Sequence, residues 1–352
     1  MNARKNPNNK PTCDCDSLWE KPDAREFIQL LEKATVNNRV VWPGYRFTNA
    51  TFVIDAGKTE KGEHCLGLWM NGKAQSYARI TKTLRMLTPL YSYYLNYKEM
   101  DSIPDNEFFK TSENAPEFRN WMNVMNVSSA VYMPLDFSKL PFSVPAITKV
   151  QLAVHEAFHV EVMLKYWYTG KGYWPKWDKQ PDRKKVQVCY TYNDTGREMI
   201  QKELFVLADM LEALLDGKKE KACSLGHQYL NARENRYEKL TGIKTTLAGN
   251  TEGDCATAEA FFELEEGLAD YESWTMLYSS GLVSRDDLLK RYRARQNDHF
   301  YLSGSMLMHA ITLMSKDPKN KIISKMINSV SVDKGSLLLL FKNQLKKYCA
   351  AR

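Results

Sequence analysis

The pattern of apolar and polar residues changes character part-way along the chain. In the first part we expect a helix, two strands, a second helix and an extended segment, at residues 24–34, 51–55, 65–69, 74–97 and 130–135. After Pro145 nearly every segment has helical periodicity, which predicts helices at residues 146–168, 197–216, 223–240, 255–279, 284–292, 300–314 and 337–348. The pattern therefore predicts an α+β protein that is mostly helical, with an all-helical second half.

This pattern also suggests how the chain is divided. We expect a disordered lead-in over residues 1–16, an α+β N-terminal lobe over residues 17–145 and a helical lobe over residues 146–352. Residues 166–185 interleave aromatic side chains with Lys and Pro and fit neither period. They predict a surface loop, or a loop that covers a cleft.

Composition and charge narrow the class of protein. The chain has 352 residues, of which 43% are apolar, and this is enough to bury a core. Its net charge of +7 is spread along the chain, so nucleic acid is not an expected partner.

We expect no transmembrane segment. No secretory signal is visible, so the compartment stays open: cytoplasmic for the chain as given, exported if a signal was removed. The oligomeric state is not indicated.

The spacing of the cysteines does not indicate a disulfide-bonded scaffold. The seven are an odd number, mostly lie far apart and form no CxxC pair. This spacing argues against a disulfide framework and against a Cys-rich zinc site. We expect buried or incidental thiols.

One motif carries metal chemistry. His155, Glu156 and His159 form an H-E-x-x-H motif within a predicted helix. A spacing of four places both imidazoles on one side of the helix, about one turn apart, where they can bind one Zn²⁺ ion. Glu156 then lies beside the metal and can take a proton from zinc-bound water.

Two other metal sites can be tested against the sequence. A di-iron carboxylate site needs a second E-x-x-H, and none of the other histidines has Glu three residues before it. The longer H-E-x-x-H-x-x-G-x-x-H pattern also fails, because Val162 and Lys165 stand where Gly and His belong. A third ligand must come from elsewhere in the chain.

The predicted helix at residues 255–279 offers that ligand. Glu259, Glu263, Glu266 and Asp270 form one acidic stripe, and like charges at this spacing repel unless a cation, such as zinc or an Arg, compensates them. Gly267 indicates a neighbour pressed against the backbone, for which the HExxH helix is the candidate. On this interpretation Glu266 completes a His, His, Glu site and Asp270 orients a ligand imidazole. A solvated acidic face is the alternative, and Glu198, Glu203 and Asp178 are the next candidates for the ligand.

The HExxH motif followed by Glu266-Gly-Leu-Ala-Asp270 resembles the gluzincin group of zinc metallopeptidases, which includes thermolysin-like enzymes and zinc aminopeptidases. The resemblance implies a zincin-like fold in which His155, His159 and Glu266 bind zinc. It also implies that Glu156 is the base and that Asp270 supports a histidine ligand.

A second stretch resembles the aminopeptidase branch of this group. Tyr301-Leu-Ser-Gly304 is similar to its Tyr-x-x-Gly helix, whose Tyr stabilises the tetrahedral intermediate. Gly304 and Ser305 are small and would let this helix approach the site closely. The resemblance implies that Tyr301 supports the oxyanion, and His299 is the alternative.

These observations lead to an expected function. We expect a zinc-dependent hydrolase that cleaves peptide bonds through a Glu-activated zinc-bound water, with one Zn²⁺ ion and a peptide or protein substrate. The extended segment at residues 130–135 could bind an extended peptide by edge pairing, as a strand does in the family. The alternatives are a zinc-binding protein of zincin fold without turnover, and a hydrolase of non-peptide amides.

Overall fold

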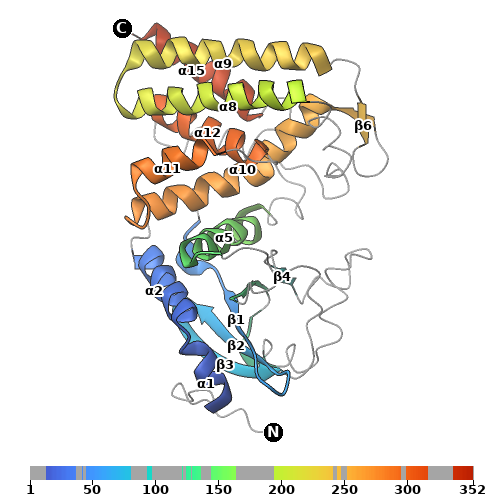
Figure 1. The fold of residues 1–352 in the computed structure, drawn as a ribbon, viewed down its shortest axis with the longest axis vertical. Coiled ribbons are helices and arrows are strands. Elements are labelled where there is room, and N and C mark those ends of the chain that lie inside the picture. The colour runs from blue at the N-terminus through green and yellow to red at the C-terminus, as the bar shows by residue number, and fades with distance from the viewer. Residues whose placement is uncertain are drawn as a thin grey trace. The chain divides into compact units, whose positions relative to one another are not determined.

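The computed structural model shows two compact units. It describes residues 13–36, 42, 45–80, 93–96, 121, 124–127, 129–135, 144–163, 194–240, 244–246, 252–294, 299–315 and 336–351. One unit comprises residues 1–39 and 45–161, and the other comprises residues 40–44 and 162–352 (Figure 1). Each unit is described by itself below.

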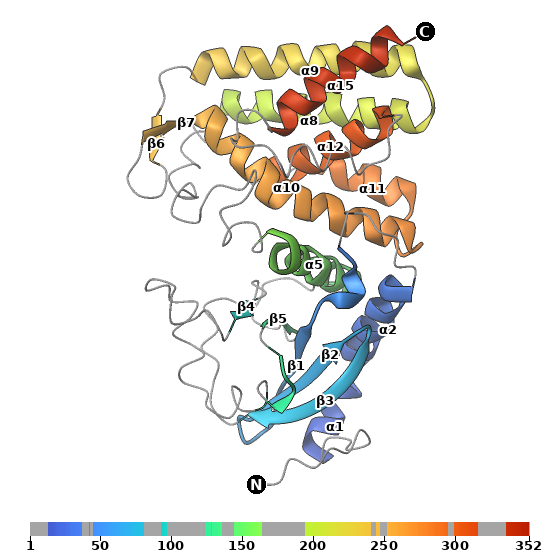
Figure 2. The same ribbon diagram turned by 180° about the vertical axis from the view of Figure 1, so that it is seen from behind.

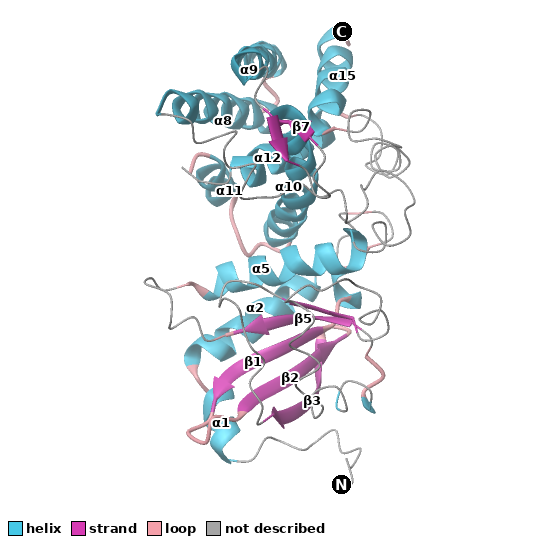
Figure 3. Ribbon diagram, turned by 90° about the vertical axis from the view of Figure 1, so that its right-hand side faces the viewer, coloured by secondary structure: helices cyan, strands magenta, loops and turns pink. Residues whose placement is uncertain are grey.

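A mixed five-stranded sheet forms the centre of the first unit. Its strands are β1 (Phe52–Lys58), β2 (His64–Met70), β3 (Lys73–Ile80), β4 (Tyr93–Asn96) and β5 (Ser129–Pro134), in the order β3-β2-β1-β5-β4. Of these, Figure 3 labels β1, β2, β3 and β5. β1 and β5 run parallel, and the other neighbouring strands are antiparallel. In both β1 and β2 the first six residues are buried, which explains why their sequences are mostly apolar rather than alternating. The polar exceptions, Asp55 and His64, bond each other at 2.6 Å. The predicted strands at residues 51–55, 65–69 and 130–135 are confirmed.

The helix predicted at residues 74–97 is wrong. Residues 73–80 form β3 and residues 93–96 form β4. Asn71 and Gly72 have φ values of 53° and 72° and connect β2 to β3 in a two-residue hairpin. Asn-Gly is the sequence that such a left-handed turn prefers, so this dipeptide is the signal that indicates strands on both sides of it.

Helices flank the sheet in the first unit. α1 (Cys13–Trp19) contacts β1, and α2 (Pro22–Val36) packs against α5 (Ala146–Phe158), which also contacts β5 and the short 3-10 helix η1 (Phe47–Asn49). The predicted helices at residues 24–34 and 146–168 are confirmed over the described residues, although the second continues as a π-helix, η3 (His159–Met163). Because Cys13–Trp19 is helical, residues 13–16 do not belong to the predicted disordered lead-in, and residues 1–12 lie outside the described residues.

The second unit is helical apart from one small hairpin. Its helices are α8 (Asp194–Leu215), α9 (Lys219–Leu240), α10 (Cys255–Ser279), α11 (Arg285–Tyr292), α12 (His299–Met314) and α15 (Leu337–Ala350). The hairpin consists of β6 (Lys244–Thr246) and β7 (Glu252–Asp254). The most extensive helix pairs are α10 with α12 and α8 with α9, and α12 also packs against α8 and α15 (Figure 2). Apolar side chains from all of these helices form the core, among them Leu207, Leu211, Tyr229, Leu268, Leu289, Leu307, Ile311 and Phe341.

The structure therefore confirms a mostly helical α+β protein with a small mixed sheet. The predicted boundary at residue 145 placed the HExxH helix in the helical lobe. In the structure the first compact unit extends along the chain to residue 161, so α5 belongs to the unit that contains the sheet. Within the described residues, no helix has both the length and the apolar content that spanning a membrane requires. The predicted loop at residues 166–185 lies outside the described residues.

The expectation of unpaired thiols is wrong. Cys15 in α1 is bonded to Cys65 in β2, and Cys223 in α9 is bonded to Cys349 in α15, with Cα–Cα distances of 5.6 and 5.9 Å. Cys255 is also in a disulfide. The bonded cysteines lie 50 and 126 residues apart in the sequence, so only the fold reveals which of them meet.

Candidate metal centre

The two histidines of the HExxH motif lie together on α5. This helix begins after Pro145, and the side chains on its apolar face are completely buried: Val150, Ala153, Val154, Ala157 and Phe158. Packing of this face fixes the rotation of the helix about its axis. It leaves His155 and His159 on the opposite side of the helix. Their ring centroids are 4.7 Å apart and their Nε2 atoms are 3.0 Å apart. The predicted pairing of the two imidazoles is confirmed.

The helix changes its winding at the second histidine. α5 ends at Phe158, and residues 159–163 form the π-helix η3. The backbone N–H of His159 is shared between the carbonyl oxygens of His155 and Glu156. Short π-helical turns within α-helices are frequent at functional sites, so the change at His159 agrees with a site at this position.

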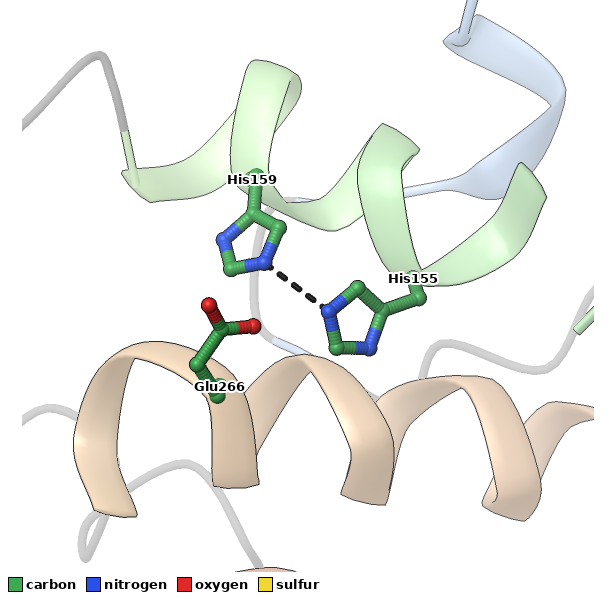
Figure 4. Close-up of side chains that lie close together, drawn as sticks. All are labelled: His155, His159 and Glu266. Carbon is green, nitrogen blue, oxygen red and sulfur yellow. Dashed lines mark hydrogen bonds between the residues drawn. The ribbon is translucent and has the colours of Figure 1, made fainter. Parts of the chain in front are cut away.

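Glu266 is the third side chain of the candidate centre. It lies on α10 (Figure 4). Glu266 and His159 are partly exposed, whereas His155 is buried. Each of the three residues offers one ligand atom, and these atoms lie within 4.8 Å of one another.

The three donors suit a zinc ion. Two imidazole nitrogens and one carboxylate oxygen are a ligand set of catalytic zinc sites. Ligand atoms at roughly 2.0–2.1 Å from a tetrahedral ion lie about 3.3 Å apart. The two Nε2 atoms are 3.0 Å apart, and all three ligand atoms lie within 4.8 Å of one another, so the spacing of the whole group extends beyond that of a tetrahedral site. In the part of the chain that the structure describes, no other group of three His, Cys, Asp or Glu side chains has such spacing.

Glu156 follows His155 in α5 and is partly exposed. In ideal helix geometry its side chain is turned by about 100° from that of His155 and by about 60° from that of His159. The placement is compatible with a proton acceptor that does not ligate the metal.

Three members of the acidic stripe of α10 contact arginines. Glu259 and Glu263 contact Arg233 of α9, and Asp270 Oδ1 lies 3.5 Å from a guanidinium nitrogen of Arg291 in α11. The alternative of a solvated acidic face is therefore wrong for Glu259, Glu263 and Asp270, which are all buried. Whether Asp270 also orients a zinc ligand stays a prediction.

Gly267 packs closely against a neighbour, as the sequence indicated, but the predicted neighbour is wrong. A Cβ atom at Gly267 would lie 2.5 Å from Gly304 Cα and 3.0 Å from the carbonyl oxygen of Phe300, both in α12. The small residues of α12 therefore bring that helix against α10. The close contact is one between two helices of the same unit.

The two candidates for oxyanion stabilisation lie at the start of α12. Tyr301 is partly exposed and its ring stacks on Phe300, with 5.2 Å between centroids. His299 is buried, and its Nε2 lies 2.8 Å from Glu259 Oε1. His299 is thus engaged with a buried carboxylate.

Sequence reasoning missed a set of charged residues inside the helical unit, which we call the buried ion cluster. Its members come from α8, α9, α10 and α12: Glu203, Arg233, Arg236, Glu259, Glu263 and His299. Arg236 binds Glu203 through two nitrogens, at 2.6 and 3.0 Å, and also binds Glu259 at 2.8 Å. The spacing of Arg233 and Arg236 on one side of α9 is the signal that could have been matched with the acidic stripe.

The pKa values of two carboxyl groups in the buried ion cluster are shifted in opposite directions. Burial alone would raise the pKa of Glu259, but Arg233 and Arg236 hold that pKa well below its ordinary value. Burial raises the pKa of Glu263, and the charge of Glu259 adds to the effect, although Arg233 opposes both.

The edge predicted for peptide binding is occupied. β5 pairs with β1 on one side, from Phe52 to Asp55, and with β4 on the other, from Tyr93 to Asn96. The prediction that residues 130–135 offer a free edge is therefore wrong, because both sides of the strand are hydrogen-bonded.

Comparison of the chain with family models, with curated proteins and with solved structures finds no match. The resemblance to gluzincins therefore stays a prediction from the sequence motifs.

Proposed function

We propose that the chain is a zinc-dependent hydrolase of peptide bonds with a zincin-like fold, in which His155, His159 and Glu266 hold one Zn²⁺ ion. The observation that carries the proposal is the approach of three ligand atoms to within 4.8 Å of one another. These atoms come from the HExxH helix and from a residue more than 100 positions later, in the ligand set that the motif requires.

A bound zinc ion acidifies water and polarises a carbonyl group, which is the chemistry that amide hydrolysis needs. Glu156 would accept the proton of the attacking water and deliver it to the leaving amine. Tyr301 would donate a hydrogen bond to the oxyanion, because His299 is already engaged with Glu259. Asp270 would support a ligand from one turn further along α10.

The ligand set is tested by metal analysis. We expect one zinc ion per chain in the wild-type protein. Loss of a residue that only hydrogen-bonds to a metal ligand lowers metal affinity roughly 10- to 100-fold. Loss of a ligand itself has a larger effect, so Glu266→Ala should lower the zinc affinity by about 100-fold or more. Glu198→Ala is the matched control, since Glu198 is an exposed glutamate on α8 and should leave zinc binding unchanged. Equal zinc affinity of Glu266→Ala and the wild type would refute the assignment of the third ligand.

Turnover is tested separately from metal binding. Glu156→Gln should keep its zinc and lose cleavage of a peptide library, because the amide cannot accept a proton. Full activity of this variant would overturn the assigned base. Stoichiometric zinc in a wild-type protein that cleaves no peptide would favour a zinc-binding protein without turnover. Cleavage of non-peptide amides alone would favour a hydrolase of those amides.

A further inference from the structure

The buried ion cluster has three acidic groups and two guanidinium groups, together with His299, which bonds Glu259 and is positively charged only when protonated. Three carboxylates, those of Glu203, Glu259 and Glu263, meet the guanidinium groups of Arg233 and Arg236. All five side chains are at most 3% exposed. The two guanidinium groups compensate two of the three carboxylates, so the cluster reaches neutrality only with one further proton, on His299 or on a carboxyl group. An uncompensated charge at this depth is strongly unfavourable, and proteins avoid it by binding a proton.

We propose that the cluster binds one proton, on the Glu263 carboxyl group, and that this proton makes the packing of α9, α10 and α12 sensitive to pH. The proposal does not depend on the metal centre, since every group in it belongs to the helical unit and none is assigned as a zinc ligand.

The hydrogen bonds identify which carboxyl group holds the proton. Glu203 receives two donors from Arg236, one on each oxygen. Glu259 receives donors from both arginines, with Arg236 contacting both of its oxygens. These two groups are held as carboxylates by charged donors on both oxygens.

Glu263 is bound differently. Its donors, Arg233 and the hydroxyl of Ser303 at 2.6 Å, both contact Oε1. Oε2 is therefore the atom that can carry a proton without displacing a donor. The raised pKa of Glu263 agrees with this choice, and burial is its main cause.

The charged and titratable groups around Glu263 come from every helix packed around the cluster. α8 contributes Glu203, α9 contributes Arg233 and Arg236 together with the rings of Tyr229 and Tyr237, α10 contributes Glu259, and α12 contributes His299. Because Ser303 of α12 and Arg233 of α9 both bind Glu263, its charge acts on the contacts that α10 makes with both helices.

The direction of the pH effect follows from the raised pKa of Glu263. A carboxyl group whose pKa is higher in the folded than in the unfolded protein stabilises the fold at low pH. That stabilisation is lost as the pH rises from the unfolded value toward the folded one. In this window the folding equilibrium constant should fall by up to tenfold per pH unit, which corresponds to one proton. The effect of Glu259 on stability has the opposite pH dependence, because its lowered pKa makes the fold less stable as the pH falls.

Thermal unfolding of the full chain between mildly acidic and alkaline pH tests the proposal. In Glu263→Gln, which has nearly the same shape and no charge, we expect the pH-dependent loss to disappear. This variant should unfold at the same temperature as the wild type, or a higher one, at the alkaline end. Glu259→Gln is the matched control on the same helix, and its folding constant should fall by far more than tenfold, since two buried arginines lose a shared partner. An unchanged pH dependence in Glu263→Gln would overturn the proposal.

Infrared spectroscopy of the folded protein tests the proton directly. A protonated carboxyl group has a carbonyl stretch that a carboxylate lacks. The wild-type minus Glu263→Gln difference spectrum at mildly acidic pH should contain this band, and the wild-type band should weaken as the pH rises. A difference spectrum with only carboxylate bands would place the proton elsewhere and refute the proposal, and so would a band of constant height across the pH range.

Discussion

Replacement of Gly304 by Ala tests how closely α10 and α12 pack. A Cβ atom at Gly304 would lie 2.8 Å from Gly267 Cα and closer still to the carbonyl oxygen of Glu263. Both neighbours are backbone atoms of α10, so the two helices must move apart to make room. Overpacking of this kind costs about 1–3 kcal/mol, and contacts with rigid backbone on two sides favour the upper end. Ala is intrinsically better than Gly in a helix by about 1 kcal/mol, which offsets part of the cost.

We therefore expect Gly304→Ala to lower the free energy of unfolding by about 2 kcal/mol. For a unit of this size that corresponds to a decrease in Tm of about 4–8 °C, which circular dichroism can follow. Gly226→Ala in α9 is the matched control. Its Cβ atom would meet only the ends of the Leu345 and Met210 side chains, which can move, so its stability should stay within about 1 kcal/mol of the wild type. Wild-type stability of Gly304→Ala, or an equal loss in both variants, would refute this account of the contact.

Two further outcomes follow from buried features of the two units. Replacing Cys223 and Cys349 together by Ala should lower the stability of the helical unit by up to about 5 kcal/mol, because the bridge spans 126 residues; an unchanged Tm in differential scanning calorimetry would contradict this. Tyr132→Phe removes a hydroxyl that donates to the buried Asp55 carboxylate and should cost about 1.5–3 kcal/mol in urea unfolding. Tyr229→Phe is its control, since among the described residues no group binds that buried hydroxyl, and a loss as large as that of Tyr132→Phe would count against the reasoning.

The sheet shows where a local signal outweighs periodicity. Residues 74–97 contain apolar positions that fit a helix, yet Asn71-Gly72 sets a tight turn and β3 then pairs with β2 from Met70 to His64. The backbone conformation of two residues decided the structure of the next eight. Attention to the turn before the periodicity would have predicted the hairpin.

The acidic stripe shows the limit of reasoning from one helix. The repulsion between Glu259 and Glu263 correctly indicated a compensating cation, but the sequence could not distinguish zinc from arginine. Arg233 lies in a different helix, and its approach depends on how α9 packs against α8. The HExxH spacing, in contrast, is contained in one helix, and for that reason the pairing of its histidines could be predicted.

The bridge between Cys223 and Cys349 closes a covalent ring that includes α10, α11 and α12. A protease that cuts the backbone once inside this ring yields two fragments that remain one molecule. The nick would be invisible on a denaturing gel run without reductant and would appear as two bands once thiol is added. Nicked chains would also keep Glu266 attached to the rest of the protein, so integrity of the chain should be judged only under reducing conditions.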